Sequence, residues 1–572
     1  MKNFFGKTAV VLGSLLLASS MLVACGGGGE EQQIDESKTQ LYVYNYNGGV
    51  GSDWLEAVKI DFETAYAETS FAAGKKGVQV FIEKAKNTSA TLANSPYNVF
   101  FTQGVRIHSD IAQNLYLNIN DIVTQSLSDI TGGEETGSIE DRLSPVVKDT
   151  LKAVKGEYYC LPHYETYDGV FYDIDVFEEY GLYFLDGGGF CEADAFDGGE
   201  YIGKGKLSVG PDGERGTSDD GMPSSYEEFY ALIDYMVRQK VVPFIWTGQY
   251  MSSYQNKLLN GVWGAVQGRD QMWQNFNFDS NATGETVLSD VAYSFNSNGE
   301  PVVEKANVTM QTGWQTSAQV GKYYGLKTLE KIVSNSSNYS SKITGVLSHL
   351  EAQEEFIYSN LENEPIAMLL EGSYWYNEAA DALNRSVSTF KERAQNRRFA
   401  MMELPRIAKG QVKEGEGTKN TLCDVLQSYA FINANVASSA EKTAVSKAFL
   451  QFAYTEDQLQ KFTLSTGTYK GLNYEVSTSQ IEGLDNYKKS IIELRNKSDV
   501  VKPLASNSLF LNKTTDFMLE FGTEVYKAVI NGTTYQDPYL AMKDSGITAE
   551  QYFLGTIRTQ ESWNKSYSSF IQ

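Results

Sequence analysis

The stretch Leu41-Tyr42-Val43-Tyr44 decides the fold class of this 572-residue chain. Its aliphatic, β-branched and aromatic side chains predict a β-strand. Trp54, Val58, Phe62 and Tyr66 then follow at helical spacing, which gives the next segment one apolar helical face. A strand followed by such a helix is the first unit of an α/β fold. We therefore expect an α/β protein.

Two further strands are predicted, at residues 78–82 and 98–102. Each is bounded by turn-forming residues or by polar helical stretches. Together they predict a parallel sheet with crossover helices. Ligands of open α/β sheets bind beyond the carboxyl ends of the strands. The candidate binding residues there are Tyr44, Asn45, Tyr46, Thr102 and Gln103. Alternatively, these residues are polar only because they lie in turns, and they bind no ligand.

The amino terminus predicts export. Lys2 and Lys7 precede an uncharged segment with an apolar core at residues 9–17, and small residues lead to a cysteine. Leu22-Val23-Ala24-Cys25 resembles a bacterial lipobox, which implies removal of residues 1–24 and a diacylglycerol on the Cys25 sulfur. Buried acyl chains would anchor the protein at the extracellular face of the cell membrane, and residues 25–38 would form a flexible polar tether. The alternative is a plain signal peptide with a fortuitous cysteine.

Composition limits the partners. The formal net charge is -24, whereas nucleic-acid binding needs clustered Lys and Arg, so we expect no nucleic-acid partner. Aromatic residues make up 13% of the chain, which suits either sugar-binding surfaces or an aromatic-rich core. His108, His163 and His349 lie far apart and no CxxC occurs, which leaves little for a zinc site or a catalytic triad. The sequence does not decide whether Cys160 and Cys191 form a disulfide.

Several motifs carry a family resemblance. The first motif spans residues 154–162 and contains Tyr158-Tyr159-Cys160-Leu161-Pro162; residues 169–182 continue it, with Phe171-Tyr172-Asp173 and Gly181-Leu182. The second motif is Pro223-Ser224-Ser225-Tyr226-Glu227-Glu228. The third is Ala367-Met368-Leu369-Leu370-Glu371-Gly372-Ser373-Tyr374-Trp375. In this order they resemble the maltose-binding-protein-like extracellular solute-binding proteins, which deliver carbohydrates to ABC importers. Asp173 departs from the family's usual Asn.

The resemblance implies a two-lobed periplasmic-binding-protein-like fold with three interlobe crossings and inserts in the second lobe. Expected lobe segments are 39–165 with 425–475, and 166–424 with 476–572. It also implies a monomer that captures a carbohydrate, an oligosaccharide by expectation, closes its lobes, and docks on permease subunits. It implies no catalytic residue.

The expected ligand-binding residues lie on loops and crossings. In the resembling family the Trp of the third motif stacks on the sugar, which assigns that role to Trp375 beside Tyr374 and Glu371; the alternative is a core Trp. The remaining candidates are Tyr164, Glu165, Tyr167, Trp246, Gln249 and Tyr429.

Two inserts, 185–221 and 277–312, are expected to be loops. The first contains Gly210-Pro211-Asp212-Gly213 and Gly216-Thr217-Ser218-Asp219-Asp220-Gly221, where Asp212, Asp219 and Asp220 could bind a structural Ca²⁺. A solvated acidic turn is the alternative.

No Gly-x-Ser-x-Gly, P-loop or HExxH motif occurs, so we do not expect an enzyme. A surface-anchored glycosidase or lyase, or an adhesive lipoprotein, remains the alternative function.

Overall fold

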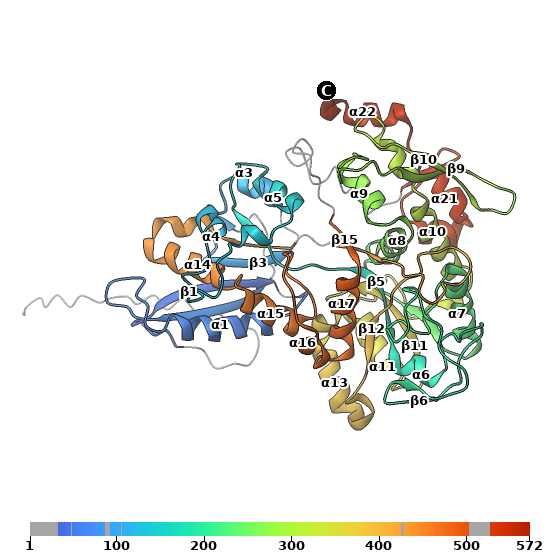
Figure 1. The fold of residues 1–572 in the computed structure, drawn as a ribbon, viewed down its shortest axis with the longest axis horizontal. Helices are drawn as coiled ribbons and strands as arrows, with labels where there is room; N and C mark the ends of the chain where they lie inside the picture. Colours follow the sequence, from blue (N-terminus) through green and yellow to red (C-terminus); the bar gives the residue numbers. More distant parts are fainter. Residues whose placement is uncertain are drawn as a thin grey trace, which may run out of the picture.

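The computed structural model describes residues 33–46, 48–85, 92–103, 106–424, 428–502 and 527–571. Figure 1 shows two lobes side by side, each built on its own sheet and its own apolar core. The predicted signal, Cys25 and most of the tether lie outside the described residues. The last part of the tether is not free of the fold, because Gln79 on the sheet accepts a hydrogen bond from the Asp35 amide and donates one to the Gln33 carbonyl.

The first lobe contains a five-stranded mixed sheet of order β2-β1-β3-β14-β4. Its strands are β1 (Thr39–Tyr46), β2 (Val78–Ala85), β3 (Val99–Gln103), β4 (Cys160–Pro162) and β14 (Ser428–Ile432). β1 is parallel to β2 and β3, as predicted. The prediction of a parallel sheet is wrong for β14, which runs antiparallel to both neighbours because it enters this lobe on the chain's return from the second.

Helix α1 (Asp53–Ala65) buries Trp54, Val58 and Phe62 against this sheet, as their spacing predicts. The other helices of the lobe are α3 (Ile107–Ala112), α4 (Asn120–Thr124), η1 (Glu140–Arg142), α5 (Pro145–Lys152), η5 (Ala434–Ser438), α14 (Ala440–Phe452) and α15 (Glu456–Thr466).

The second lobe contains a four-stranded sheet of order β12-β5-β11-β8. The strands are β5 (Asp168–Asp173), β8 (Val242–Ile245), β11 (Ile366–Gly372) and β12 (Phe399–Met401). β5 and β11 are buried along their whole length, which explains their continuous apolar runs.

Two helices of the second lobe frame the site described below: α8 (Met251–Gln267) packs on β5 and β11, and the short α12 (Trp375–Glu378) follows β11. The others are α6 (Ile174–Glu179), α7 (Tyr226–Arg238), α9 (Arg269–Asn277), η2 (Gly313–Ala318), α10 (Val320–Val333), η3 (Ser336–Asn338), α11 (His349–Ser359), α13 (Ala380–Phe390), η4 (Lys391–Ala394), α16 (Thr478–Glu482), α17 (Asn486–Lys497), α20 (Pro538–Ser545), α21 (Ala549–Thr556) and α22 (Gln560–Ile571).

The inserts are not wholly loops. Residues 277–312 contain the antiparallel hairpin β9 (Ser289–Phe295) and β10 (Pro301–Ala306), whose turn uses the positive φ of Gly299. Residues 185–221 contain a short hairpin of β6 (Phe196–Asp197) and β7 (Glu200–Tyr201). Two further pairs are β13 (Thr421–Cys423) with β15 (Asp499–Val501) and β16 (Ala528–Ile530) with β17 (Thr533–Tyr535).

Among the elements that the structure describes, the chain passes between the lobes three times: β4 to β5, β13 to β14, and α15 to α16. Buried charges tie them together. Lys502 Nζ lies 2.7 Å from Glu165 Oε1 on the first connection and 3.1 Å from Asp424 Oδ2 on the second. Lys502 and Arg495 outweigh the cost of burial and lower the pKa of Glu165, so its carboxylate is charged at neutral pH. The residue boundaries predicted for the lobes stay a prediction.

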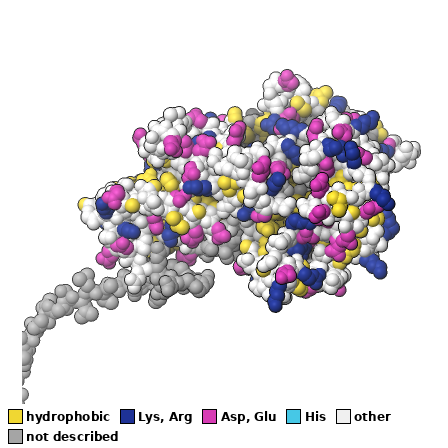
Figure 2. Space-filling model, turned by 60° about the horizontal axis from the view of Figure 1, so that its bottom comes forward, with side chains coloured by type: hydrophobic (Ala, Val, Ile, Leu, Met, Phe, Trp, Pro, Cys, Tyr) yellow, Lys and Arg dark blue, Asp and Glu magenta, His cyan; other side chains and the backbone are white. Residues whose placement is uncertain are grey.

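Cys160, Cys191 and Cys423 are buried free thiols, so the Cys160–Cys191 disulfide does not form. Within the described ranges, none of the helices has the length and apolarity needed to cross a bilayer. Figure 2 shows acidic and basic side chains interspersed over one face, without a large patch of either sign.

We expect Lys502→Met to lower the free energy of unfolding by about 3–5 kcal/mol, because it leaves Glu165 and Asp424 buried without this cation. Denaturant unfolding followed by circular dichroism measures the change. Lys419→Met is the matched control: its ion pair with Asp499 is exposed, so the loss should stay below about 1 kcal/mol. Equal losses in the two variants would contradict the structural role of Lys502.

Candidate ligand-binding site between the lobes

The loop after β1 meets helix α12 of the other lobe. Gly48 allows this approach, since an added Cβ would lie 3.2 Å from Glu378 Oε1 and 2.9 Å from the Tyr46 ring. Asn377 Nδ2 donates to the Thr466 carbonyl, 2.7 Å away and in the first lobe. The carboxyl end of β1, where sheet ligands are expected, thus faces the second lobe.

The first lobe contributes Tyr46, Gln103 and Tyr164 to this junction, all of them predicted site residues. The Tyr164 hydroxyl donates to Gln103 Oε1, and both atoms lie beside Gly49, where a Cβ would overlap the hydroxyl. Asn45 is buried and shapes the loop, because its Nδ2 donates to the Gly51 carbonyl, 3.0 Å away.

The second lobe contributes Glu371, Tyr374, Lys257 and Asp168. Lys257 Nζ lies 3.2 Å from Asp168 Oδ1, 3.3 Å from the Tyr374 hydroxyl and 3.8 Å from Glu371 Oε1. Asp168 is therefore its counter-ion. Burial raises the pKa of Glu371 to about 8, with a further contribution from the Glu378 charge, so Glu371 is mostly protonated at neutral pH.

Sequence reasoning missed several members of this junction. Gln353 Nε2 donates to Glu378 Oε2 (2.9 Å) and Glu371 Oε2 (3.3 Å), and His349 Nε2 lies 3.7 Å from Glu378 Oε1. The Tyr250 ring lies 6.0 Å from the His349 ring and is 49% exposed. These residues come from α11, α12 and the start of α8, whose helical patterns give no sign of a shared site.

The resulting group combines carboxyl, amide and phenol groups with an exposed aromatic ring. Such groups can accept and donate hydrogen bonds to hydroxyls, and Tyr rings offer a flat apolar face. The arrangement suits a polyhydroxylated ligand with apolar faces.

Other predicted site residues lie elsewhere. Tyr44, Thr102 and Tyr429 are buried in the first lobe, and Trp246 is buried in the second-lobe core against the Tyr339 and Tyr539 rings. Glu165 and Tyr167 belong to the buried network at the crossings. Gln249 is exposed beside Tyr250.

Trp375 is fully buried among the rings of Phe171, Phe356, Phe399 and Tyr487. Both faces of its indole are covered by protein in this conformation, so the structure favours the core interpretation over sugar stacking. Tyr374, the preceding residue, is the aromatic side chain that reaches the interlobe junction.

A pocket of about 420 Å³ lies between the lobes on the side of Glu165. Its lining includes Pro145 and Leu472 from the first lobe and Trp273, Arg495 and Lys502 from the second. Tyr164 contacts Gln103 and Gly49, whereas Glu165 contacts Lys502 and Arg495, which line the pocket. The pocket is therefore behind the crossings, away from Tyr46 and Glu378.

The acidic insert is folded. Asp212 and Asp219 are buried side by side, with the Asp212 amide donating to Asp219 Oδ2 at 3.0 Å. Asp220, the third predicted ligand, turns away and accepts from the Gly216 amide at 2.9 Å.

The solved structures include similar folds. A binding protein of an ABC transporter from Bifidobacterium animalis subsp. lactis, in complex with mannobiose, aligns at a TM-score of 0.50 and 13% identity, covering 93% of this chain and 95% of that chain. The two chains share a fold. This confirms the predicted two-lobed α/β architecture.

Two further neighbours are more distant. A chitin oligosaccharide binding protein has a TM-score of 0.47 at 15% identity, covering 93% of this chain and 98% of its own. A maltotriose binding protein of Thermus thermophilus has a TM-score of 0.46 at 12% identity, and the alignment covers 92% of this chain and 99% of that chain. No family model and no curated protein matches the chain.

We expect Trp375→Ala to lower the free energy of unfolding by about 3–5 kcal/mol, the range for removing a large aromatic ring from a core. Under conditions where the variant stays folded, its ligand affinity should equal that of the parent protein. Denaturant titration and calorimetry on the same samples separate the two effects. Normal stability with lost binding would return Trp375 to the ligand site.

Proposed function

We propose that the protein binds a carbohydrate, with an oligosaccharide as the expected form, between its two lobes and delivers it to an ABC permease. The observation that carries the proposal is the meeting of Tyr46 and Tyr164 from the first lobe with Glu378 and Tyr374 from the second. A ligand held by residues of both lobes is enclosed when they close, which is the hinge motion of binding proteins.

The chemistry supports a sugar over a charged ligand. The junction contains acidic residues as well as Lys257, and Lys257 is already paired with Asp168. No single sign of charge therefore prevails there. Protonated Glu371 can donate a hydrogen bond, while the Glu378 carboxylate can accept one. The exposed Tyr250 ring supplies the apolar face on which a pyranose C–H surface packs. The fold shared with the mannobiose-bound protein agrees with this ligand class.

Calorimetry against a panel of oligosaccharides tests the proposal. With the glycan that binds, Glu378→Gln and Tyr250→Ala should each weaken affinity at least about tenfold, roughly 1.4 kcal/mol, without lowering the melting temperature. Glu362→Gln, an exposed acid of the same lobe, is the control and should bind normally. Turnover of a polysaccharide, with no heat from any intact glycan, would favour the enzyme alternative.

We also propose that the mature protein is a lipid-anchored monomer at the extracellular face of a bacterial membrane, attached through Cys25. Cys25→Ala should move the protein from the membrane fraction to the medium or block its processing, because the sulfur is the lipid acceptor. Gln32→Ala, in the same polar stretch, should fractionate like the parent protein. Unchanged fractionation of Cys25→Ala would remove the anchor from the proposal.

A further inference from the structure

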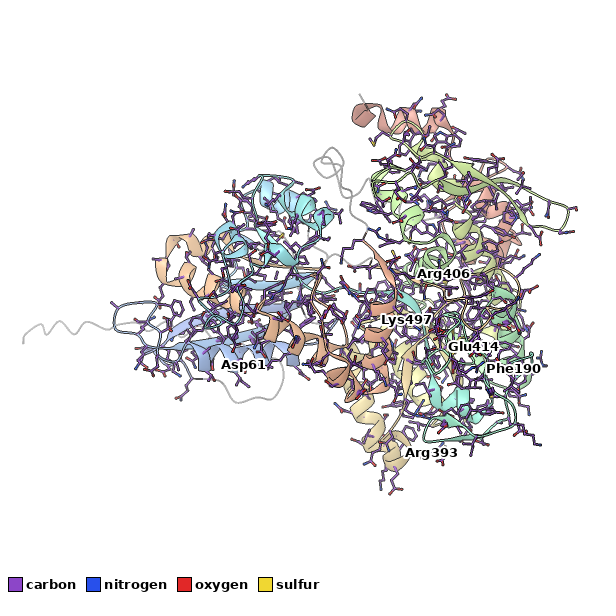
Figure 3. All side chains as sticks on the ribbon, in the orientation of Figure 1. Asp61, Phe190, Arg393, Arg406, Glu414 and Lys497 are labelled. Carbon is purple, nitrogen blue, oxygen red and sulfur yellow. The ribbon has the colours of Figure 1, made fainter. Side chains whose placement is uncertain are left out.

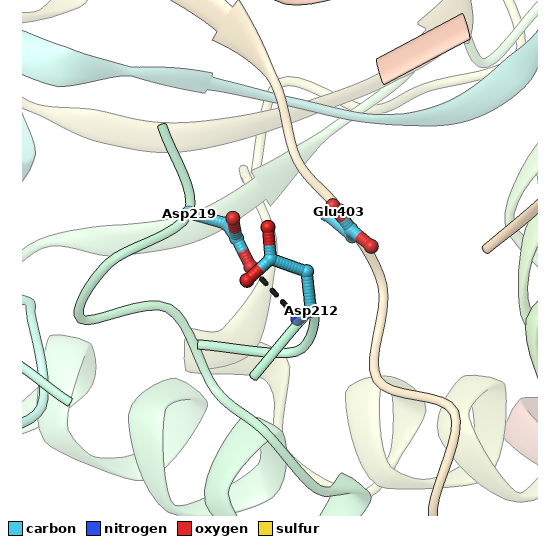
Figure 4. A group of neighbouring side chains, drawn as sticks. All are labelled: Asp212, Asp219 and Glu403. Atoms are coloured by element: carbon cyan, nitrogen blue, oxygen red, sulfur yellow. Dashed lines mark hydrogen bonds between the residues drawn. The ribbon is translucent and has the colours of Figure 1, made fainter. Parts of the chain in front are cut away.

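Three carboxyl groups converge inside the second lobe. Asp212 and Asp219 come from the first insert, and Glu403 follows β12 (Figure 4). All three residues are buried, with 5%, 3% and 4% exposure. One oxygen of each lies within 4.8 Å of an oxygen of the other two. Residues nearly 200 positions apart thus meet at one point.

The insert is shaped to hold its two carboxylates in place. Asp219 Oδ1 accepts from the Thr217 hydroxyl at 2.8 Å, and Asp212 Oδ1 accepts from the Glu214 amide at 2.8 Å. Gly210 adopts φ +64°, and a Cβ there would overlap the Asp219 carbonyl oxygen. The loop can take this path only with glycine at that position.

One lysine forms ion pairs with all three acids, and Arg406 acts on Glu403 from farther away. Lys497 Nζ, from the end of α17, lies 2.9 Å from Asp212, 3.1 Å from Asp219 and 2.7 Å from Glu403 (Figure 3 labels Lys497 in the second lobe). When all three acids are ionised, the cluster keeps two uncompensated negative charges. Burial makes such uncompensated charge costly, because a buried carboxylate is stable only when a cation or a hydrogen bond compensates it.

Glu403 also has unused bonding capacity. Its Oε1 atom is buried and has no hydrogen-bond partner among the residues that the structure describes. The Glu403 side chain borders a small cavity of about 20 Å³, which Ser218, Asp219 and Lys497 also line and Asp212 does not. A cavity needs about 10–15 Å³ to hold a water-sized particle. There is thus space beside an unpartnered buried carboxylate oxygen.

We propose that Asp212, Asp219 and Glu403 bind one Ca²⁺ ion between their carboxyl groups, beside Lys497. Ca²⁺ takes oxygen ligands at about 2.3–2.6 Å. Three oxygens 4.8 Å apart lie about 2.8 Å from their common centre, so a shift of a few tenths of an ångström lets one ion contact all three carboxylates. Its two positive charges bring the cluster to neutrality. The ion fixes the insert to the segment that follows β12, and Asp220 is not a ligand.

The test uses the mature protein after treatment with a chelator and titrates it with CaCl₂ by calorimetry. We expect one site per chain and a melting temperature that rises with Ca²⁺, because the ion binds only the folded state. Glu403→Gln should weaken Ca²⁺ binding at least tenfold. Asp220→Asn is the matched control, an acid in the same loop outside the cluster, and should bind like the parent.

A second variant distinguishes loss of the Ca²⁺ site from loss of the fold. Lys497→Met removes the competing cation, so its Ca²⁺ affinity should rise and its melting temperature should depend more strongly on Ca²⁺ than that of the parent. Misfolding cannot produce tighter binding. The proposal is overturned if the parent shows no Ca²⁺ heat and no melting shift, if Glu403→Gln binds like the parent, or if Asp220→Asn loses binding instead.

Discussion

The structure depends on charges buried where the chain passes between the lobes. Glu165, Asp424 and Lys502 come from segments far apart in sequence, and each has a partner in another segment. A buried carboxylate without a cation is costly, so the segments must stay together for the charges to be stable. The Thr166 amide adds to this, because it donates to Asp424 Oδ1 at 3.0 Å. The network therefore fixes which strands meet at the pivot.

The same crossing segment positions the ligand site. Tyr164 and Asp168 contact the junction, through Gln103 and Lys257, while Glu165 and Tyr167 contact each other within the buried network. Structural and binding roles are thus assigned to neighbouring residues of one segment, and the charges that hold the register also aim Tyr164 at Gln103.

Local sequence patterns predicted the strands and helices, but not which side of each element a given side chain lies on. β1 to β3 and α1 follow from alternation and spacing, because each pattern reports burial within one element. Tyr44 and Tyr46 look equivalent in sequence, yet one packs in the core and the other reaches the junction. The motif around Trp375 correctly marked the interlobe region, but burial of its indole depends on Phe356, Phe399 and Tyr487 from other elements. Glu403 and Lys497 gave no sequence signal, since their meeting with the insert is purely tertiary.

The pocket behind the crossings has a mechanical consequence. It is lined by both lobes, so a hinge rotation that separates Tyr46 from Glu378 also changes the distance between Pro145 and Trp273 across the pocket. The two conformations then differ in the volume of enclosed solvent, and hydrostatic pressure becomes a variable that acts on their equilibrium without touching the ligand.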